Sequence, residues 1–230
     1  MAKTSDVYKS LEPLFRPKTI AVLGASAEPS KIGGRPVQLL KDFGYTGKIF
    51  PVNPNYEEVQ GLKAYASIKD IKETVDQVIM AVPARFAIPV AEDCAAMGVK
   101  SMVAFTSGFA EMNAEGEKAQ IRLGEIAQES GMRILGPNCL GVFNSHMNAY
   151  STFTSSILDG RPKPGPVGIA SQSGAFGSHC FVLARARGLG MSYWATTGNE
   201  CDVGFAECVQ FLAEDEGTKV ILGYMEGCRD

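Results

Sequence analysis

Short runs of aliphatic and β-branched residues alternate with longer amphipathic runs through most of this chain. The short runs predict strands at Thr19–Leu23, Lys48–Val52, Val75–Val82, Ser101–Phe105 and Arg133–Leu135. The amphipathic runs between them predict helices at Pro36–Phe43, Phe86–Met97 and Glu115–Ser130. Because strands that alternate with helices form parallel sheets covered by helices on both faces, we predict an α/β protein with a Rossmann-like, doubly wound parallel sheet.

The amino-acid composition changes before residue 163. Residues 144–156 are rich in Ser, Thr and Asn, and residues 161–166 include three prolines, which is a composition typical of a linker. We therefore expect a first domain over residues 1–162 and a second over residues 163–230.

The second domain is predicted to contain only part of another doubly wound sheet. The predicted strands are Val167–Ala170, Ser192–Thr196 and Lys219–Tyr224, and the predicted helices are Ala175–Arg187 and Val203–Ala213. The sequence stops shortly after the last of these strands, where a helix would normally start. We expect the domain to continue on a further segment or on another polypeptide, and the exposed apolar sheet surface of a partial domain to favour association, for example as a homo-oligomer.

Charge, hydropathy and cysteine content disfavour several classes of protein. The 22 Lys and Arg residues against 25 Asp and Glu leave a net charge of −3, which disfavours binding to nucleic acid or to an anionic membrane. No apolar run approaches the roughly 18 to 20 residues of a membrane helix, and the polar amino terminus lacks a signal peptide, so a cytoplasmic protein is expected. Six cysteines without a CxxC pair, and only two histidines, predict reduced thiols and no metal site.

A glycine-rich loop follows the first predicted strand, beginning at Gly24 and ending at Gly34. In an open α/β sheet such a loop lies beyond the carboxyl ends of the strands and predicts a phosphate-binding site. Ser26 and Pro29 occupy two of the three glycine places of the dinucleotide fingerprint, and Asn53 stands where an NAD site would have an acidic residue. Lys31 and a neutral Asn53 suit a ligand with additional phosphate charge, while simple tight turns are the structural alternative.

The ends of the later predicted strands also carry Pro or Gly. The segments concerned are Val82-Pro83-Ala84, Ser107-Gly108 and Gly136 to Gly141. Small residues along one edge of a sheet leave a crevice in which an extended ligand can lie.

Taken in order, these segments resemble the CoA-binding domain of the NDP-forming (ADP-forming) acyl-CoA synthetases, the superfamily that includes the alpha subunit of succinyl-CoA synthetase. The matching pieces are residues 14–26, 51–54, 82–84, 136–141 and 167–177, and the resemblance runs from about residue 10 to the end of the chain. It implies that the second domain is a partial flavodoxin-like, succinyl-CoA-synthetase-like domain.

The resemblance also implies roles for individual residues. The CoA phosphates would be held by Gly24, Ala25, Ser26 and Lys31. The rest of the CoA groove would be lined by Asn53, Pro54, Val82, Pro83, Ala84, Ser107 and Gly108. Asn138, in the turn near the thiol end, would polarise an acyl carbonyl, and the neighbouring Cys139 is expected to be a small buried thiol rather than a nucleophile.

A second phosphate-binding segment is predicted at Ser171, Gln172, Ser173 and Gly174, where a strand runs into a helix. It lacks the GxSxG pattern of a hydrolase nucleophile. The resemblance implies that it steadies a phosphohistidine whose imidazole is oriented by Glu226, although a solvated glutamate at a strand end is the alternative. In the relatives that histidine lies downstream of the strand matched by Lys219–Tyr224, and His146 and His179 are both expected to have no catalytic role.

The implied function is an acid-thiol ligase that makes an acyl-CoA from a carboxylic acid, CoA and ATP through acyl-phosphate and phosphohistidine intermediates. ATP and Mg would bind an ATP-grasp domain or beta subunit, so this chain would bind CoA without turning over alone. The alternative is a CoA-sensing or regulatory module fused to, or partnering, a protein acetyltransferase, which the segment after residue 230 would distinguish. A nicotinamide dehydrogenase is disfavoured by Ser26, Pro29 and Asn53.

Overall fold

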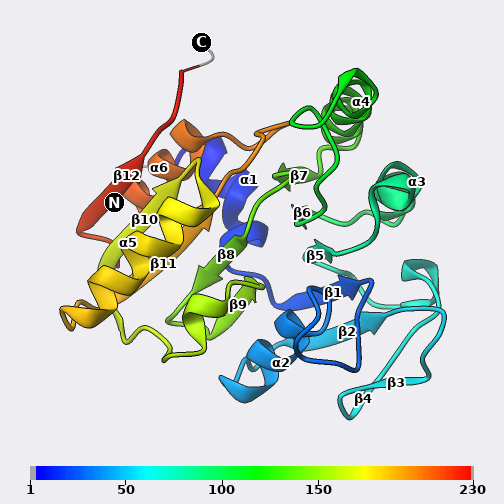
Figure 1. Cartoon of the computed structure of the whole chain (residues 1–230), viewed down its shortest axis with the longest axis horizontal. Helices are drawn as coiled ribbons and strands as arrows, with labels where there is room; N and C mark the ends of the chain where they lie inside the picture. The colour runs from blue at the N-terminus through cyan, green and yellow to red at the C-terminus, as the bar shows by residue number, and fades with distance from the viewer. Residues whose placement is uncertain (1–3, 229–230) are drawn as a thin grey trace.

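The first half of the chain forms a five-stranded sheet in which all strands are parallel. The structure is a computed structural model that describes residues 4–228. The strands of the first sheet are β1 (Thr19–Leu23), β2 (Lys48–Val52), β5 (Gln77–Met80), β6 (Ser101–Ala104) and β7 (Arg133–Leu135), in the order β2-β1-β5-β6-β7. The accompanying helices are α1 (Asp6–Phe15), α2 (Arg35–Asp42), α3 (Ala84–Ala96) and α4 (Ala114–Ser130). The predicted doubly wound α/β fold is confirmed (Figure 1).

Both faces of this sheet are covered, which explains why its strands read as unbroken apolar runs. Helices α3 and α4 pack side by side, and with the sheet they enclose one apolar core. The other face, with α1 and α2, contacts the second half of the chain and contributes to a core that both halves share.

The second half forms a mixed sheet. Its strands are β8 (Gly141–Asn144), β9 (Ala149–Thr152), β10 (Pro164–Ser171), β11 (Met191–Thr196) and β12 (Val220–Tyr224), in the order β12-β10-β11-β8-β9. β10 pairs in parallel with β11 and β12, whereas β8 pairs antiparallel with β11 and β9. Helices α5 (Gly174–Ala186) and α6 (Phe205–Glu214) complete it, and β12 lies at its edge with Val220 50% exposed.

The interpretation of residues 144–156 as linker is wrong. β8 and β9 form a hairpin in which every strand residue is buried. Their polar side chains are satisfied internally: Asn144 Nδ2 donates to Phe15 O (3.0 Å), Thr152 Oγ1 donates to Leu140 O (2.6 Å), and Ser151 donates to Gln77. Composition therefore misled because buried polar groups with partners are compatible with a core strand. The division at residue 163 remains a prediction, and the second sheet draws two strands from residues before it.

The first helix, α1, has no counterpart among the predicted elements. Ser5 caps it, with its side chain accepting from the Tyr8 N–H, and the helix buries four side chains. The rings of Tyr8 and Phe15 stack on Phe211 of α6, with centroids 4.6 and 4.3 Å away. The amino-terminal helix thus joins the two halves of the molecule.

Smaller elements lie between β2 and β5. They are β3 (Glu58–Val59), β4 (Leu62–Lys63) and the 3₁₀ helix η1 (Ile68–Asp70), and a second 3₁₀ helix, η2 (Ser155–Ile157), follows β9. Over residues 4–228, none of the helices combines the length and the apolar content that crossing a bilayer would require.

Candidate functional site

Two adjoining clefts lie at the carboxyl ends of the first-sheet strands, with volumes of about 380 and 500 Å³. Gly24 and Asn53 line both clefts. Strand ends of this kind are where ligands bind in open α/β sheets. Of the residues predicted for the CoA groove, this edge gathers Gly24, Ala25, Ser26, Lys31, Asn53, Pro54, Val82 and Pro83 on the cleft walls.

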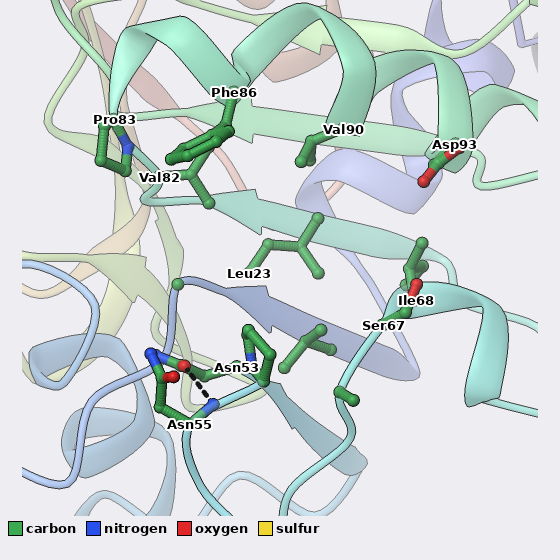
Figure 2. Close-up of a pocket in the computed structure, with 14 residues that line it drawn as sticks. Leu23, Asn53, Asn55, Ser67, Ile68, Val82, Pro83, Phe86, Val90 and Asp93 are labelled. Atoms are coloured by element: carbon green, nitrogen blue, oxygen red, sulfur yellow. Dashed lines mark hydrogen bonds between the residues drawn. The ribbon is translucent and has the colours of Figure 1, made fainter.

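The larger part of the first cleft's wall is apolar. Leu23 and Val82 lie at strand ends, Phe86 and Val90 come from α3, and Ile68 comes from η1 (Figure 2). The Phe86 ring is 48% exposed although its neighbours in the cleft are apolar. An exposed aromatic ring beside a concave apolar surface suits a planar ring of a ligand.

The glycine-rich loop is held by its own backbone bonds. The N–H groups of Gly24 and Ala25 both donate to Val52 O, at 3.0 and 3.2 Å, and the Ser26 N–H donates to Gly33 O at 3.4 Å. These three donors therefore face the protein. Outside these bonds, the loop lines the second cleft with Ser30, Lys31, Ile32 and Gly33. The Lys31 N–H donates to Glu28 O (3.1 Å), which leaves the N–H groups of Ser30, Ile32 and Gly33 for a phosphate.

Gly24 is required by the close approach of two strand ends. Its φ is +81°, and a Cβ atom there would lie only 2.5 Å from Ala81 O. Any side chain at residue 24 is consequently both strained and in collision with backbone.

Lys31 is paired with an acidic neighbour. Its Nζ lies 2.9 Å from Glu28 Oε1, and this hydrogen bond together with the charge of Glu28 raises the pKa of Lys31. Both side chains are more than half exposed. The pair is thus screened by water and open to exchange with an anionic ligand.

Asn53 and Gln60 brace the loop from the side. Asn53 Nδ2 donates to Ala25 O (2.8 Å), and its Oδ1 accepts from the Asn55 N–H (3.0 Å), as the dashed line in Figure 2 shows. Gln60 Nε2 donates to Ser26 O (3.0 Å) and to Gly34 O (2.9 Å). The sequence analysis missed Gln60, although Gln60-Gly61 between the apolar residues Val59 and Leu62 is a signal for a two-residue hairpin turn.

The other residues predicted for the CoA groove, Ala84, Ser107 and Gly108, line neither of the two clefts and lie between β6 and α4 or at the start of α3. Pro83 and Ala84 start α3, and a Cβ atom on Gly108 would lie 3.1 Å from Ala84 Cβ. Ser107 is exposed beside Gly108. Glu111 Oε1 accepts from the Gly108 N–H (2.6 Å); although burial alone would raise the pKa of Glu111, this bond and one from Asn199 lower it.

The turn from Gly136 to Gly141 lies between the two sheets. Asn138 is exposed, has a φ of +56°, and donates through Nδ2 to Asn199 Oδ1 at 3.3 Å. Cys139 is 2% exposed, and burial raises the pKa of its thiol to about 12. A neutral, buried thiol agrees with the expectation that Cys139 is not a nucleophile.

The predicted phosphate seat lies where β10 runs into α5. Ser173 caps α5 by accepting from the Phe176 N–H (3.3 Å), and Ser171 Oγ donates to Ser173 O (2.7 Å). Gln172 Oε1 accepts from the N–H groups of Glu226 (2.6 Å) and Gly227 (3.0 Å). The seat and Glu226 are therefore brought together, with the Glu226 residue exposed.

Glu200 belongs to the same cluster and was given no role in the sequence analysis. It has a φ of +54°, its Oε2 accepts from Gln172 Nε2 (3.1 Å), and its Oε1 accepts from the Phe205 N–H (3.0 Å). Only the fold shows this, because residues 172 and 200 come from different strand ends. His146 and His179 are both exposed, in the β8–β9 turn and on α5 respectively.

Comparison with known proteins agrees with this geometry. The family model for a CoA binding domain matches residues 18–145, and that for a succinyl-CoA ligase like flavodoxin domain matches residues 164–230. The chain is 40% identical over 220 residues to the alpha subunit of ADP-forming acetate–CoA ligase II from Pyrococcus furiosus, a match that covers 96% of this chain and 47% of that protein. It therefore spans about half the length of the curated relative.

Solved structures agree. A crystal structure of a Pyrococcus horikoshii protein matches with a TM-score of 0.89 and 42% identity, covering 96% of this chain and 49% of that one. The dinucleotide-forming acetyl-coenzyme A synthetase 1 of Ca. Korarchaeum cryptofilum matches with a TM-score of 0.88 and 36% identity, covering 95% and 46%. The order of motifs predicted the right relatives, and the chain belongs to the CoA binding domain family, with a succinyl-CoA ligase like flavodoxin domain matched after that domain.

Proposed function

We propose that this chain is the CoA-binding portion of an NDP-forming acyl-CoA synthetase, an acid-thiol ligase. The observation that carries the proposal is the pair of adjoining clefts, one largely apolar and one containing Lys31, which meet at Gly24 and Asn53. CoA matches this arrangement, because it carries a planar adenine ring, which suits the apolar cleft, and anionic phosphates, which suit the cleft that contains Lys31.

The residues present fit such a ligand. The apolar cleft with Phe86 and Ile68 would take the adenine ring, and Lys31 with the backbone N–H groups of Ile32 and Gly33 would hold phosphate oxygens. The thiol end would run past Ser107 and Gly108 toward Asn138, whose exposed amide can donate to an acyl carbonyl.

The complete enzyme would make an acyl-CoA from a carboxylic acid, CoA and ATP through an acyl phosphate and a phosphohistidine. ATP, Mg²⁺ and the histidine would belong to an ATP-grasp domain or beta subunit and to further parts of the protein. In this chain, Ser171 to Gly174 would hold the phosphoryl group of the phosphohistidine at the start of α5, and Glu226 would orient the imidazole. Cys94, Cys139, Cys180, Cys201 and Cys208 are free thiols, which suits a reducing cytoplasm.

Relatives with different acids share this portion of the fold. They include a trans-feruloyl-CoA synthase at 38% identity and a 4-hydroxybutyrate–CoA ligase at 32%. The acid substrate is thus not fixed by the CoA-binding residues.

The test is calorimetric titration of the purified chain with CoA, with NADH as the control ligand. Gly24→Ala and Gly98→Ala are a matched pair: both residues have a positive φ (+81° and +70°), but only at residue 24 would the Cβ atom meet backbone. We expect saturable CoA binding that is lost, or weakened by at least about tenfold, in Gly24→Ala and preserved in Gly98→Ala. Equal losses in both variants, or binding of NADH and not CoA by the wild-type chain, would refute the proposed site.

A further inference from the structure

The loop that follows β11 joins the two proposed ligand sites. Its Asn199 N–H donates to Pro137 O (2.9 Å), the Cys201 N–H donates to Gly136 O (2.9 Å), and the Thr197 N–H donates to Ser171 O (2.8 Å). Residues 197–201 therefore bond both to the turn at the end of the proposed CoA groove and to the start of the phosphate seat.

The Asn199 side chain forms hydrogen bonds with residues near the proposed CoA groove. Its Nδ2 donates to Glu111 Oε2 (2.5 Å) and to Gln120 Oε1 (2.9 Å), while its Oδ1 accepts from Asn138 Nδ2 (3.3 Å). Glu111 in turn accepts from the Gly108 N–H. One side chain thus ties together Asn138 and the loop that carries Ser107 and Gly108.

The side chain of the next residue, Glu200, forms a hydrogen bond with the phosphate seat. Its Oε2 accepts from Gln172 Nε2 (3.1 Å), and its Oε1 accepts from Thr197 Oγ1 (2.6 Å) and from the Phe205 N–H (3.0 Å). Gln172 also donates to Gly227 O (3.0 Å) and accepts from the Glu226 N–H (2.6 Å). The position of the segment that carries Glu226 is therefore set through Glu200.

We propose that Asn199 and Glu200 are positioning residues that couple the thiol end of the CoA groove to the phosphate seat. The inference rests on the proposed function for the identity of the two ligands. Adjacent residues cannot move independently, and Glu200 is held in a left-handed conformation that its three hydrogen bonds stabilise. Ordering of this dipeptide by one ligand lowers the ordering cost for the other, which produces positive coupling.

The experiment measures the CoA affinity of the chain with and without inorganic phosphate, at constant ionic strength set with chloride. We expect phosphate to raise the affinity for CoA about fivefold, the low end of ordinary coupling. If phosphate competed with CoA at the glycine-rich loop, it would lower the affinity for CoA, and that result would overturn the proposal. An affinity for CoA that did not change with phosphate would overturn it as well. In parallel, ¹⁵N spectra should show the side-chain amide of Gln172 shifting when CoA is added.

Glu200→Gln separates coupling from folding. The new amide keeps an oxygen for Thr197 and Phe205 but turns an NH₂ group toward the NH₂ group of Gln172, so only the link to the seat is lost. We expect CoA affinity without phosphate to be unchanged, the phosphate effect to vanish and the Gln172 amide to stop responding.

Glu117→Gln is the control, since it removes one negative charge from an exposed side chain of α4. Full coupling in Glu200→Gln, or equal loss in Glu117→Gln, would overturn the assignment. The wild-type measurement alone tests the coupling if a variant fails to fold. Absence of CoA binding by the wild-type chain would refute the proposed function as well, whereas CoA binding without coupling would refute this inference alone.

Discussion

Lys31 and Glu28 show how a single residue of the proposed site is tuned by its neighbour. The 2.9 Å contact leaves the loop with almost no net charge, although the loop faces a cleft proposed for phosphates. The sequence identified the lysine, but only the folded loop shows that its charge is shared.

We predict that Glu28→Gln strengthens CoA binding by several fold and steepens its salt dependence, because the freed ammonium then interacts with the ligand alone. Lys31→Met should weaken binding and flatten the salt dependence. Titration at two salt concentrations measures both effects. Glu58→Gln, on an exposed residue of β3, is the charge-matched control, and an equal gain in that variant would contradict the explanation.

Asp76 gives a pH-dependent contribution to stability. Its side chain is 14% exposed and accepts from Lys100 Nζ (2.7 Å) and from the Lys18 N–H (2.9 Å). Burial alone would raise the pKa of Asp76, but these hydrogen bonds hold it below its ordinary value of 3.8. A carboxyl group with a lowered pKa stabilises the fold above that ordinary value, and the contribution is lost as the pH falls through the folded-state pKa.

Asp76→Asn should therefore lower the free energy of unfolding by about 1 to 3 kcal/mol at pH 7. The difference from wild type should shrink as the pH is lowered below about 4. Urea unfolding at several pH values checks this. Asp159→Asn, at a side chain 81% exposed, should leave the free energy of unfolding unchanged at every pH. If the stability difference between Asp76→Asn and wild type stayed constant with pH, the proposed link between the pKa of Asp76 and stability would be excluded.

At the scale of elements, the regular α/β units were predictable and the irregular ones were not. The strands of the first sheet are unbroken apolar runs, and helices α3 and α4 have a helical period over enough residues to be recognised. β3 and β4 have two residues each, too few for a period. β8 and β9 carry buried polar residues, among them Asn144 and Ser151, whose composition is typical of a loop.

The β3–β4 hairpin supports the glycine-rich loop through Gln60, which predicts a local effect on binding. Gln60→Ala removes hydrogen bonds to Ser26 O and Gly34 O and should weaken CoA binding about three- to tenfold, with a loss of about 1 to 2 kcal/mol in stability. Asn148→Ala in the β8–β9 turn, where φ is also positive, should leave binding intact. Calorimetry and thermal unfolding of both variants distinguish a loop effect from general destabilisation.

At the scale of the whole molecule, the two halves share a core and a partly buried ion-pair network, so we predict that they unfold as one unit. Arg133 of β7 contacts Asp202 (3.1 Å) and Glu207 (2.8 Å), and the Arg133 side chain is only 17% exposed. Arg16 of the amino-terminal segment also pairs with Asp215 after α6.

Arg133→Met leaves two acidic groups without their cation and should cost about 3 kcal/mol of unfolding free energy. Trp194, buried in the second sheet, reports on that half by fluorescence, while circular dichroism reports on both. We expect the two signals to change together in urea and both midpoints to fall. Arg122→Met is the control, because its three ion pairs lie on the surface and should be worth less than about 1 kcal/mol. Two separate transitions in the wild-type chain would contradict a shared core.

The sequence by itself determined the α/β class and the glycine-rich loop, because periodicity and turn residues are local properties that survive without the fold. It also pointed to the relatives, through the resemblance of its motifs taken in order. It also placed Gly24, Asn138, Ser171 and Glu226 at strand ends. Only the tertiary structure decided which donors of the loop are already used, that Gln60 braces it, and that Asn199 and Glu200 lie between the groove and the seat. Those facts depend on contacts between residues far apart in the chain, which no local pattern records.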